Sequence, residues 1–371
     1  MRNPPRRAKI GKRLWLLLLF PAALLLHFCA AEISGFAEWY ATGIYPVFSR
    51  AVNRLTGLVP FSVAELAVFA FALFFAAALI RLAVRLIRGK GRRAAAAVKF
   101  FVNLAVLVSV AAFWFTAACG VNYSRLTFAQ TGGLEIKPSS KAELKKLCSS
   151  LAADLGGLRP GLATDARSVM KLRAGSLDET ARKAARYYDG MERDYPLLKS
   201  GYGAPKPVLF SRLMSRCGVT GVFFPFTFEA NVNTDVPEYT LPATMCHELS
   251  HLRGYMREDE ANFLGYLVCK KSGDPDFMYS GDMLAFTCAN NALYSADAEA
   301  AGRIYASLDE GVRRDLSFNA AYWKRFEGPV SRASNRLNDR YLKANRQEDG
   351  VKSYGRMVDL LLAEQRAERK E

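Results

Sequence analysis

The sequence is poor in the residues from which metal and disulfide sites are usually built. It has only three histidines among 371 residues, and its seven cysteines form no C-x-x-C pair. The missing C-x-x-C pairs exclude the common cysteine-based zinc sites and leave no complete disulfide framework. We therefore expect most of the cysteines to be buried free thiols that pack as small apolar side chains. With so few histidines, a regular spacing between two of them is informative.

Acidic residues are scarce in the first third of the chain. Residues 1–121 contain fifteen Lys or Arg but only Glu32, Glu38 and Glu65, a net charge of +12 out of the +16 of the whole chain. The remaining residues are nearly balanced, with 36 basic and 32 acidic side chains. A nucleic-acid partner is therefore not indicated, because the excess basic residues lie in the most apolar part of the chain.

Long apolar runs account for this distribution of charge. Residues 14–33, about 59–80 and about 100–121 are predominantly apolar. Each run is roughly 20 residues long, which is the length that a helix needs to cross the hydrocarbon core of a bilayer. We therefore predict a membrane region at residues 1–121 with three transmembrane helices, and a lipid bilayer as its partner.

Basic residues flank these runs unevenly. Six precede the first run and seven separate the second from the third, whereas only Arg50 and Arg54 lie between the first and the second. The positive-inside rule then places the N-terminus in the cytoplasm and residues 122–371 outside it. The alternative for the first run is a cleaved signal peptide, because Ala30 and Ala31 resemble a processing site. Both interpretations leave the C-terminal part extracytoplasmic.

The remainder of the chain predicts a mainly α fold with a small β-sheet (α+β). Helical periodicity covers Ser139–Leu155, and a second helix follows a cap at Ser176 or Asp178. Aromatic and β-branched residues are concentrated in Pro207–Phe210 and Gly221–Asn233, which we expect to be strands. An exposed edge of such a sheet can bind an extended peptide by strand addition, while an ordinary core sheet is the alternative.

Two of the three histidines stand four residues apart, in His247-Glu248-Leu249-Ser250-His251. This is the HExxH pattern of zinc-dependent hydrolases. Positions i and i+4 share one face of a helix, so both imidazoles can bind one Zn²⁺ ion, and Glu248 can act as the general base on a zinc-activated water. Thr240 and Gly254 are suited to begin and end this helix.

Two histidines do not complete a zinc site, so a third ligand is needed. Gly254 fits the glycine of the HExxHxxGxxH pattern, but Arg257 stands where that pattern has its third histidine, which excludes the metzincin form. In the gluzincin form, a glutamate on a following helix completes the site. We prefer Glu258, because it shares a helix face with Gly265 and other small residues that let two helices approach closely. Glu260 remains the alternative ligand.

These residues predict a membrane-anchored, zincin-like zinc metallopeptidase that hydrolyses peptide or protein substrates. Its metal ligands are His247, His251 and Glu258, and Glu248 is its catalytic base. The competing hypothesis is a non-enzymatic, zinc-stabilised membrane sensor or scaffold of the cell envelope. The intact Glu248 favours the enzyme, because a structural zinc site needs no base and usually has four protein ligands.

Other side chains near the motif are candidates for supporting roles. A tyrosine or a cation is needed to stabilise the oxyanion of the transition state. The candidates for this role are Tyr255, Arg257, Tyr279 and Tyr294. Asn262 is a candidate to orient one of the ligand histidines through its second ring nitrogen.

Several segments together resemble a known family. Three of them surround the motif, at residues 224–233, 247–251 and 257–264, and the others are residues 122–125, 279–281, 341–345 and 350–354. They resemble the bacterial family of uncharacterised membrane proteins called domain of unknown function 3810. The resemblance extends over nearly the whole chain. It implies a bacterial cell-membrane protein with several N-terminal spans followed by an HExxH domain, here residues 122–371, and it implies no substrate.

Overall fold

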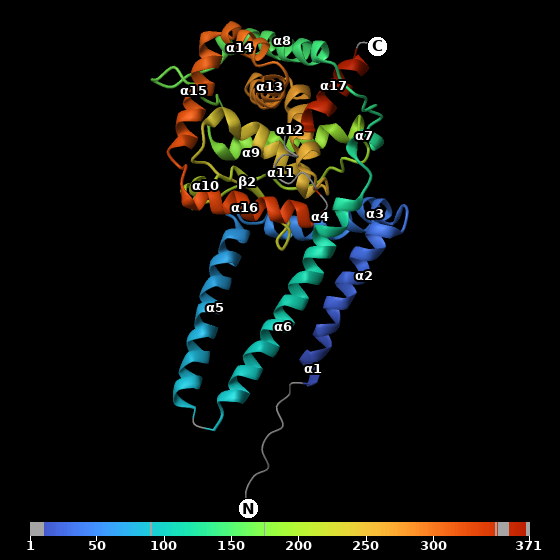
Figure 1. The fold of residues 1–371 in the computed structure, drawn as a ribbon, viewed down its shortest axis with the longest axis vertical. Helices are drawn as coiled ribbons and strands as arrows, with labels where there is room; N and C mark the ends of the chain where they lie inside the picture. Colours follow the sequence, from blue (N-terminus) through green and yellow to red (C-terminus); the bar gives the residue numbers. More distant parts are fainter. Residues whose placement is uncertain (1–10, 90, 174, 346, 348–355, 369–371) are drawn as a thin grey trace, which may run out of the picture.

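The computed structural model describes residues 11–89, 91–173, 175–345, 347 and 356–368. Helices dominate these residues and one small sheet is present, as the sequence predicts. Long helices extend from one side of a helical body (Figure 1). The Gly350–Tyr354 part of the family resemblance and the basic residues before Gly11 lie outside the described residues.

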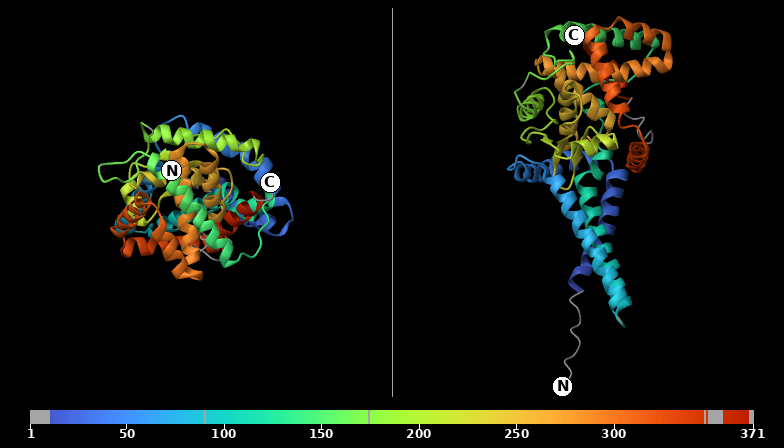
Figure 2. Two further views of the ribbon diagram at one scale, coloured as in Figure 1. Left: turned by 90° about the horizontal axis from the view of Figure 1, so that it is seen from above. Right: turned by 90° about the vertical axis from the view of Figure 1, so that its left-hand side faces the viewer.

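The N-terminal third supplies the long helices. Its elements are α1 (Gly11–Leu14), η1 (Trp15–Leu18), α2 (Leu19–Glu32), α3 (Phe36–Trp39), α4 (Tyr45–Thr56), α5 (Val63–Arg88) and α6 (Arg93–Ala118). Three stretches of the described chain are long and apolar enough to cross a membrane: Trp15–Glu32, Val63–Arg88 and Arg93–Ala118. All three extend away from the body in the same direction (Figures 1 and 2). Three membrane-length helices are therefore confirmed, whereas their orientation in the cell stays a prediction.

α5 and α6 begin and end at other residues than the apolar runs predicted. α5 begins at Val63 because the Ser62 hydroxyl accepts the Glu65 N–H at 3.0 Å and caps the helix. It continues through a basic segment to Arg88, since arginine is a good helix former. α6 begins at Arg93 and gives way to the 3-10 helix η3 (Gly120–Ser124). Hydropathy locates the apolar part of each helix but not its ends.

The body is built from shorter helices that pack around α11 and α12. They are α7 (Phe128–Thr131), α8 (Lys141–Leu158), α9 (Leu177–Gly190), α10 (Ser211–Cys217), α11 (Leu241–Leu252), α12 (Glu258–Lys271), α13 (Pro275–Ala296), α14 (Ala298–Ser307), α15 (Glu310–Lys324), α16 (Pro329–Ala344) and α17 (Met357–Glu368). Ser140 and Ser176 cap α8 and α9, the two helices predicted in this region. α16 runs along the base of the body (Figure 1), where Tyr341 contacts Phe115 of α6. All seven cysteines are free.

The sheet has three strands in the order β1-β3-β2. β1 (Lys206–Pro207) pairs in parallel with β3 (Glu229–Val232), and β2 (Gly221–Phe224) pairs with β3 in antiparallel orientation. The predicted strand Pro207–Phe210 is largely wrong, because the N–H groups of Leu209 and Phe210 donate to the Glu65 carboxylate instead. The second predicted strand is a hairpin, with a turn between β2 and β3.

β3 is fixed to the first turn of α5. Its Glu229 carboxylate accepts the N–H groups of Val63 and Ala64 at 3.2 and 2.6 Å, where the helix dipole favours a negative charge. Lys206 Nζ pairs with the same carboxylate and balances its charge. The Ser62 hydroxyl also donates to Asn231 Oδ1 on β3 at 2.6 Å. The sheet is thereby held at the end of a membrane-length helix.

α4 connects the N-terminal third to the interior of the body. The Tyr45 hydroxyl donates to the Leu252 carbonyl at 3.1 Å, at the end of α11. Asn53 Nδ2 donates to the Phe228 carbonyl at 2.7 Å, in the turn between β2 and β3. Tyr45 and Phe228 are fully buried, and their rings meet edge to face. α11 and the turn between β2 and β3 therefore pack against α4, which precedes the second membrane-length helix, α5.

Candidate metal centre

α11 carries both motif histidines and Glu248 into the interior of the body. Its apolar side, which includes Leu249 and Leu252, is fully buried. The His247 and His251 rings lie on one face of the helix, with their centroids 4.6 Å apart. The predicted cap by the Thr240 side chain is wrong, because its hydroxyl donates to the Pro237 carbonyl at 2.8 Å.

A tight turn after α11 brings the chain back toward the histidines. Gly254 has a φ of 87°, a left-handed conformation that glycine adopts without strain. On α12, a Cβ atom at Gly265 would lie 3.1 Å from the Ala243 carbonyl oxygen and 3.2 Å from the His247 nitrogen. The absence of a side chain at Gly265 lets α12 lie directly against α11. Glu258, the first residue of α12, thus lies beside the motif.

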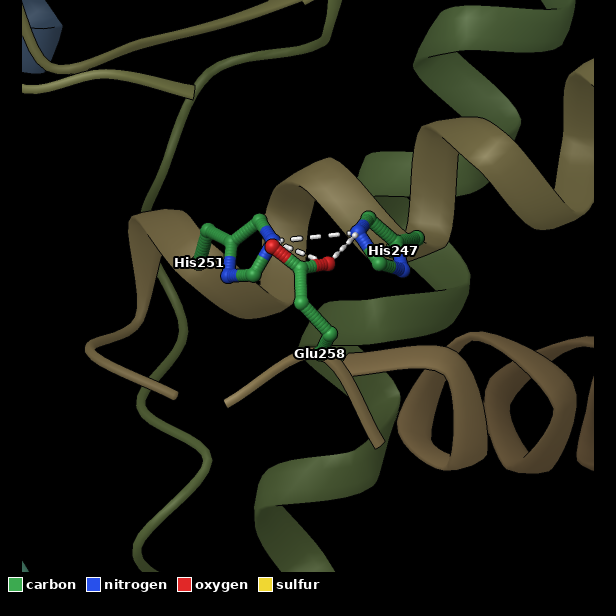
Figure 3. Close-up of side chains that lie close together, drawn as sticks. All are labelled: His247, His251 and Glu258. Carbon is green, nitrogen blue, oxygen red and sulfur yellow. Dashed lines mark hydrogen bonds and ion pairs between the residues drawn. The ribbon is translucent and has the colours of Figure 1, made fainter. Parts of the chain in front are cut away.

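Three side chains converge on one point between α11 and α12 (Figure 3). His247 Nε2 and His251 Nε2 are 3.0 Å apart. Glu258 Oε2 lies 3.3 Å from His247 Nε2 and 3.6 Å from His251 Nε2. Ligand atoms about 2.0–2.1 Å from a tetrahedral zinc ion are separated by about 3.3 Å. The spacing of the three donor atoms therefore fits a zinc ion.

Hydrogen bonding fixes the orientation of His251. Its Nδ1 lies 2.8 Å from the Tyr255 carbonyl oxygen, which can only accept, so Nδ1 carries hydrogen and Nε2 faces the other two donors. Burial lowers the pKa of His251, but the charges of Glu258 and Glu248 outweigh burial and raise it to about 9. Although burial opposes it, the two histidines hold the pKa of Glu258 well below its ordinary value. In this structure the protonated His251 and the Glu258 carboxylate form an ion pair.

Glu260, the alternative ligand, lies elsewhere. Its carboxylate accepts the Phe128 N–H at 2.7 Å and lies 3.7 Å from Arg257 Nη1. Burial raises the pKa of this carboxyl to about 7, against the opposing charge of Arg257. The two glutamates point away from each other because they are two positions apart on a helix. Only Glu258 shares the cluster with the histidines.

Glu248 is buried beside the cluster. Its Oε2 atom has no hydrogen-bond partner among the described residues. Burial raises the pKa of its carboxyl, partly offset by the charges of His247 and His251. β2 covers it closely, because a Cβ atom at Gly221 would overlap the Glu248 carboxylate. A buried carboxylate oxygen without a partner is costly, and it indicates a group that acts on something bound in the site.

A cavity of about 910 Å³ opens onto these four residues. Its walls include β2, α16 and the chain that follows α6. Tyr123 and Tyr341 line it, and the Tyr123 hydroxyl donates to the Tyr341 hydroxyl at 3.1 Å. The Tyr341 hydroxyl accepts this bond, and its own proton faces only the weak acceptor Cys119 Sγ, 3.8 Å away, among the described residues. It is therefore a suitable donor to a bound carbonyl oxygen.

The four side chains predicted to stabilise an oxyanion do not line this cavity. The Tyr279 hydroxyl donates to Asp315 at 2.6 Å, and Tyr294 is 65% exposed. Tyr255 is buried against the Arg125 guanidinium, and Arg257 contacts backbone carbonyls. Asn262 does line the cavity, but within the described chain it makes no hydrogen bond to either imidazole.

The sequence motifs did not predict a role for Tyr123 or Tyr341. These two residues are 218 positions apart, so no local sequence pattern indicates that they are in contact. Both nevertheless belong to segments that carried the family resemblance, at residues 122–125 and 341–345. That resemblance was the available signal, and it gave no role to either tyrosine.

Fold and site together define a mainly helical protein with three candidate membrane helices and a buried His-His-Glu cluster that fits a metal ion. The chain belongs to the family described as a protein of unknown function, DUF3810, whose model matches residues 40–362. The family expected from the sequence is thereby confirmed. Comparison with curated proteins gave no match, and neither did comparison with solved structures.

Proposed function

We propose that this protein is a membrane-anchored zinc metallopeptidase. The observation that carries the proposal is the buried, unpartnered Oε2 atom of Glu248 beside three donor atoms with tetrahedral spacing. A structural zinc site would have a fourth protein ligand and no need for such a base. The donor set of two imidazoles and one carboxylate suits zinc.

In this proposal, His247, His251 and Glu258 hold the zinc ion. Bound zinc supplies the Lewis acidity that lowers the pKa of water to about 7. Glu248 accepts the proton that the attacking water loses and delivers it to the leaving amine. Burial favours this cycle, because a carboxyl with a raised pKa takes up a proton more readily than an exposed one.

Two other elements contribute to substrate binding in the proposal. The Tyr341 hydroxyl donates to the substrate carbonyl oxygen as its negative charge develops. β2 is an edge strand, with no further strand paired to it in the described part of the chain, and residues 220–223 line the cavity. An extended peptide can pair with this edge and pass Glu248 at Gly221. Peptides and proteins are therefore the substrates that the cavity suits best.

The test compares the purified protein with its Glu248→Gln variant, loaded with zinc, with Glu299→Gln on exposed α14 as the matched control. Zinc content is measured by mass spectrometry, and proteolysis with a degenerate fluorogenic peptide pool. We expect one zinc ion in all three proteins and cleavage in all but Glu248→Gln. The absence of zinc from every protein would refute the proposal.

The non-enzymatic alternative predicts a different pattern. A zinc-stabilised sensor or scaffold would bind zinc in all three proteins and cleave nothing. Its Glu248→Gln variant would also be at least as stable as the parent, because a buried carboxylate with one unpartnered oxygen is removed. A higher midpoint of thermal unfolding without any peptidase activity would therefore favour the scaffold.

A further inference from the structure

The cavity extends from α13 to the membrane end of the body. Its lining includes Cys119, immediately after α6, and Pro225 in the turn between β2 and β3. Leu337 and Tyr341 of α16 form another part of the wall. Figures 1 and 2 show α16 and the ends of the long helices at the same level. The site is thus close to where the membrane-length helices enter the body.

Two segments next to the site reach past this level, along the membrane helices. Trp114 Nε1, on α6, donates to the Pro225 carbonyl at 3.0 Å. Trp114 is four residues before the end of α6, about 6 Å along the helix. The Phe210 ring lies 4.8 Å from that of Phe69, which is six residues, or about 9 Å, into α5. The β2–β3 turn and residues 209–210 therefore lie at the depth of the outer turns of both helices.

Apolar side chains are exposed on these two segments and on the adjoining helices α10 and α16. Leu209 is 85% exposed and Leu337 is 70% exposed, and Phe210, Leu213 and Phe226 are also exposed. We call these five residues the apolar rim. Soluble surfaces rarely gather such side chains, but they suit the interface between lipid headgroups and acyl chains. α16 adds exposed Arg332, Arg336 and Arg340, which suit anionic headgroups. The rim is continuous with α5 and α6 through Phe69 and Trp114.

β2 connects the site to this rim. It runs from Gly221, against Glu248, to Phe224, and the turn that follows contains Phe226. The extended chain from Gly221 to Phe224 advances three residues, about 10 Å, before the turn begins. A peptide paired with the free edge of β2 would follow this direction. One of its ends would leave the cavity at the membrane surface.

We propose that the substrates are membrane-anchored polypeptides, cleaved in an extended segment within about ten residues of their anchor. This inference rests on the proposed peptidase function and names its substrate class. In this proposal, the apolar rim lies in the membrane interface and keeps this end of the cavity there. A segment far from its anchor gains nothing from this placement.

The experiment uses the zinc-loaded full chain in vesicles of phosphatidylcholine and phosphatidylglycerol. The probe is a degenerate fluorogenic decapeptide pool, joined to a palmitoyl anchor through either three or thirty Gly/Ser residues. Both pools have the same surface density, so a difference in cleavage rate cannot come from different enrichment on the membrane. We expect the short-tethered pool to be cleaved at least tenfold faster. Equal rates for the two tethers would overturn the inference while leaving the peptidase function intact.

A second measurement does not depend on turnover. Benzoylphenylalanine at Val222, on β2, is photo-crosslinked to each pool in the Glu248→Gln background. Preferential capture of the short-tethered pool supports the inference even if no peptide is cleaved, a result that would count against the peptidase function alone. Equal capture overturns it. The same photoprobe at Phe226 is expected to form lipid adducts. At Tyr305 on α14, the control position, we expect none. The absence of lipid adducts from Phe226 as well as from Tyr305 would refute the placement of the rim.

Discussion

Glu258 and Glu260 differ in environment although they are two residues apart on α12. Glu258 lies within 3.6 Å of both histidine Nε2 atoms, whereas Glu260 accepts the Phe128 N–H. We predict that Glu258→Gln weakens zinc binding by more than the roughly 10–100-fold that the loss of an outer hydrogen bond costs. Competition with a fluorescent chelator measures the affinity.

Glu260→Gln is the matched control for this substitution. It preserves the shape of the side chain and removes a buried charge whose pKa is raised to about 7, so zinc affinity should stay within a few-fold of the parent. If Glu260→Gln rather than Glu258→Gln abolished zinc binding, the assignment of ligands would be reversed.

His251 gives zinc binding a defined dependence on pH. With a pKa of about 9, its imidazole is protonated between pH 6 and 8, and its Nδ1 hydrogen is held by the Tyr255 carbonyl. Zinc must therefore displace the proton at Nε2. We predict that the apparent affinity rises at least about tenfold for each pH unit in this range, since one proton is released.

Calorimetric titration of zinc, repeated in buffers of different ionisation enthalpy, measures the number of protons released. At pH 7.5 at least one proton per zinc ion is expected. Affinity that does not change between pH 6 and 8, with no proton release, would contradict the ion pair between His251 and Glu258.

At the scale of elements, the contact between β2 and α11 determines where Glu248 lies. A Cβ atom at Gly221 would overlap the Glu248 carboxylate, and a carboxylate at the end of a flexible side chain yields more easily than the backbone of a strand. We predict that Gly221→Ala displaces Glu248 and lowers kcat on the order of 100-fold, the effect of a misplacement of about 1 Å. Zinc content should not change, because the three ligands lie on α11 and α12.

Gly302→Ala on α14 is the control for this prediction, since a Cβ atom there meets nothing within 4 Å. It should leave kcat unchanged. Loss of zinc from Gly221→Ala would show instead that β2 supports the metal ligands and not the base.

The same elements indicate which features a sequence reveals. The helix faces of α11 and α12 depend on local periodicity, so the proximity of Glu258 and Gly265 to the motif could be predicted. The strand expected at Pro207–Phe210 failed because Glu65, more than 140 residues earlier, takes its backbone N–H groups. Tyr123 and Tyr341 meet only through the packing of α16 on the chain after α6. Contacts between residues so far apart in the chain produce no periodic pattern in the sequence and could not be predicted from it.

At the scale of the whole molecule, the membrane-length helices and the body are built together. Glu229 accepts the first N–H groups of α5, and Tyr45 of α4 donates to the end of α11. The turn between α5 and α6 lies at the far end from the body (Figure 1). If three helices cross the membrane, this turn and the body must therefore lie on opposite sides of it.

Charge then predicts which side each occupies. Arg81, Arg85 and Arg88 near the end of α5, with Arg92 and Arg93 at the start of α6, favour the cytoplasm for the turn. We predict that a cysteine at Ala94→Cys in cells reacts with a membrane-impermeant maleimide only after permeabilisation, whereas Ser307→Cys on α14 reacts without it. Both positions are exposed, and labelling of the parent chain corrects for its native cysteines. Labelling of Ala94→Cys alone in intact cells would invert the predicted orientation and place the His-His-Glu cluster in the cytoplasm. The substrates would then be the cytoplasmic segments of membrane-anchored polypeptides.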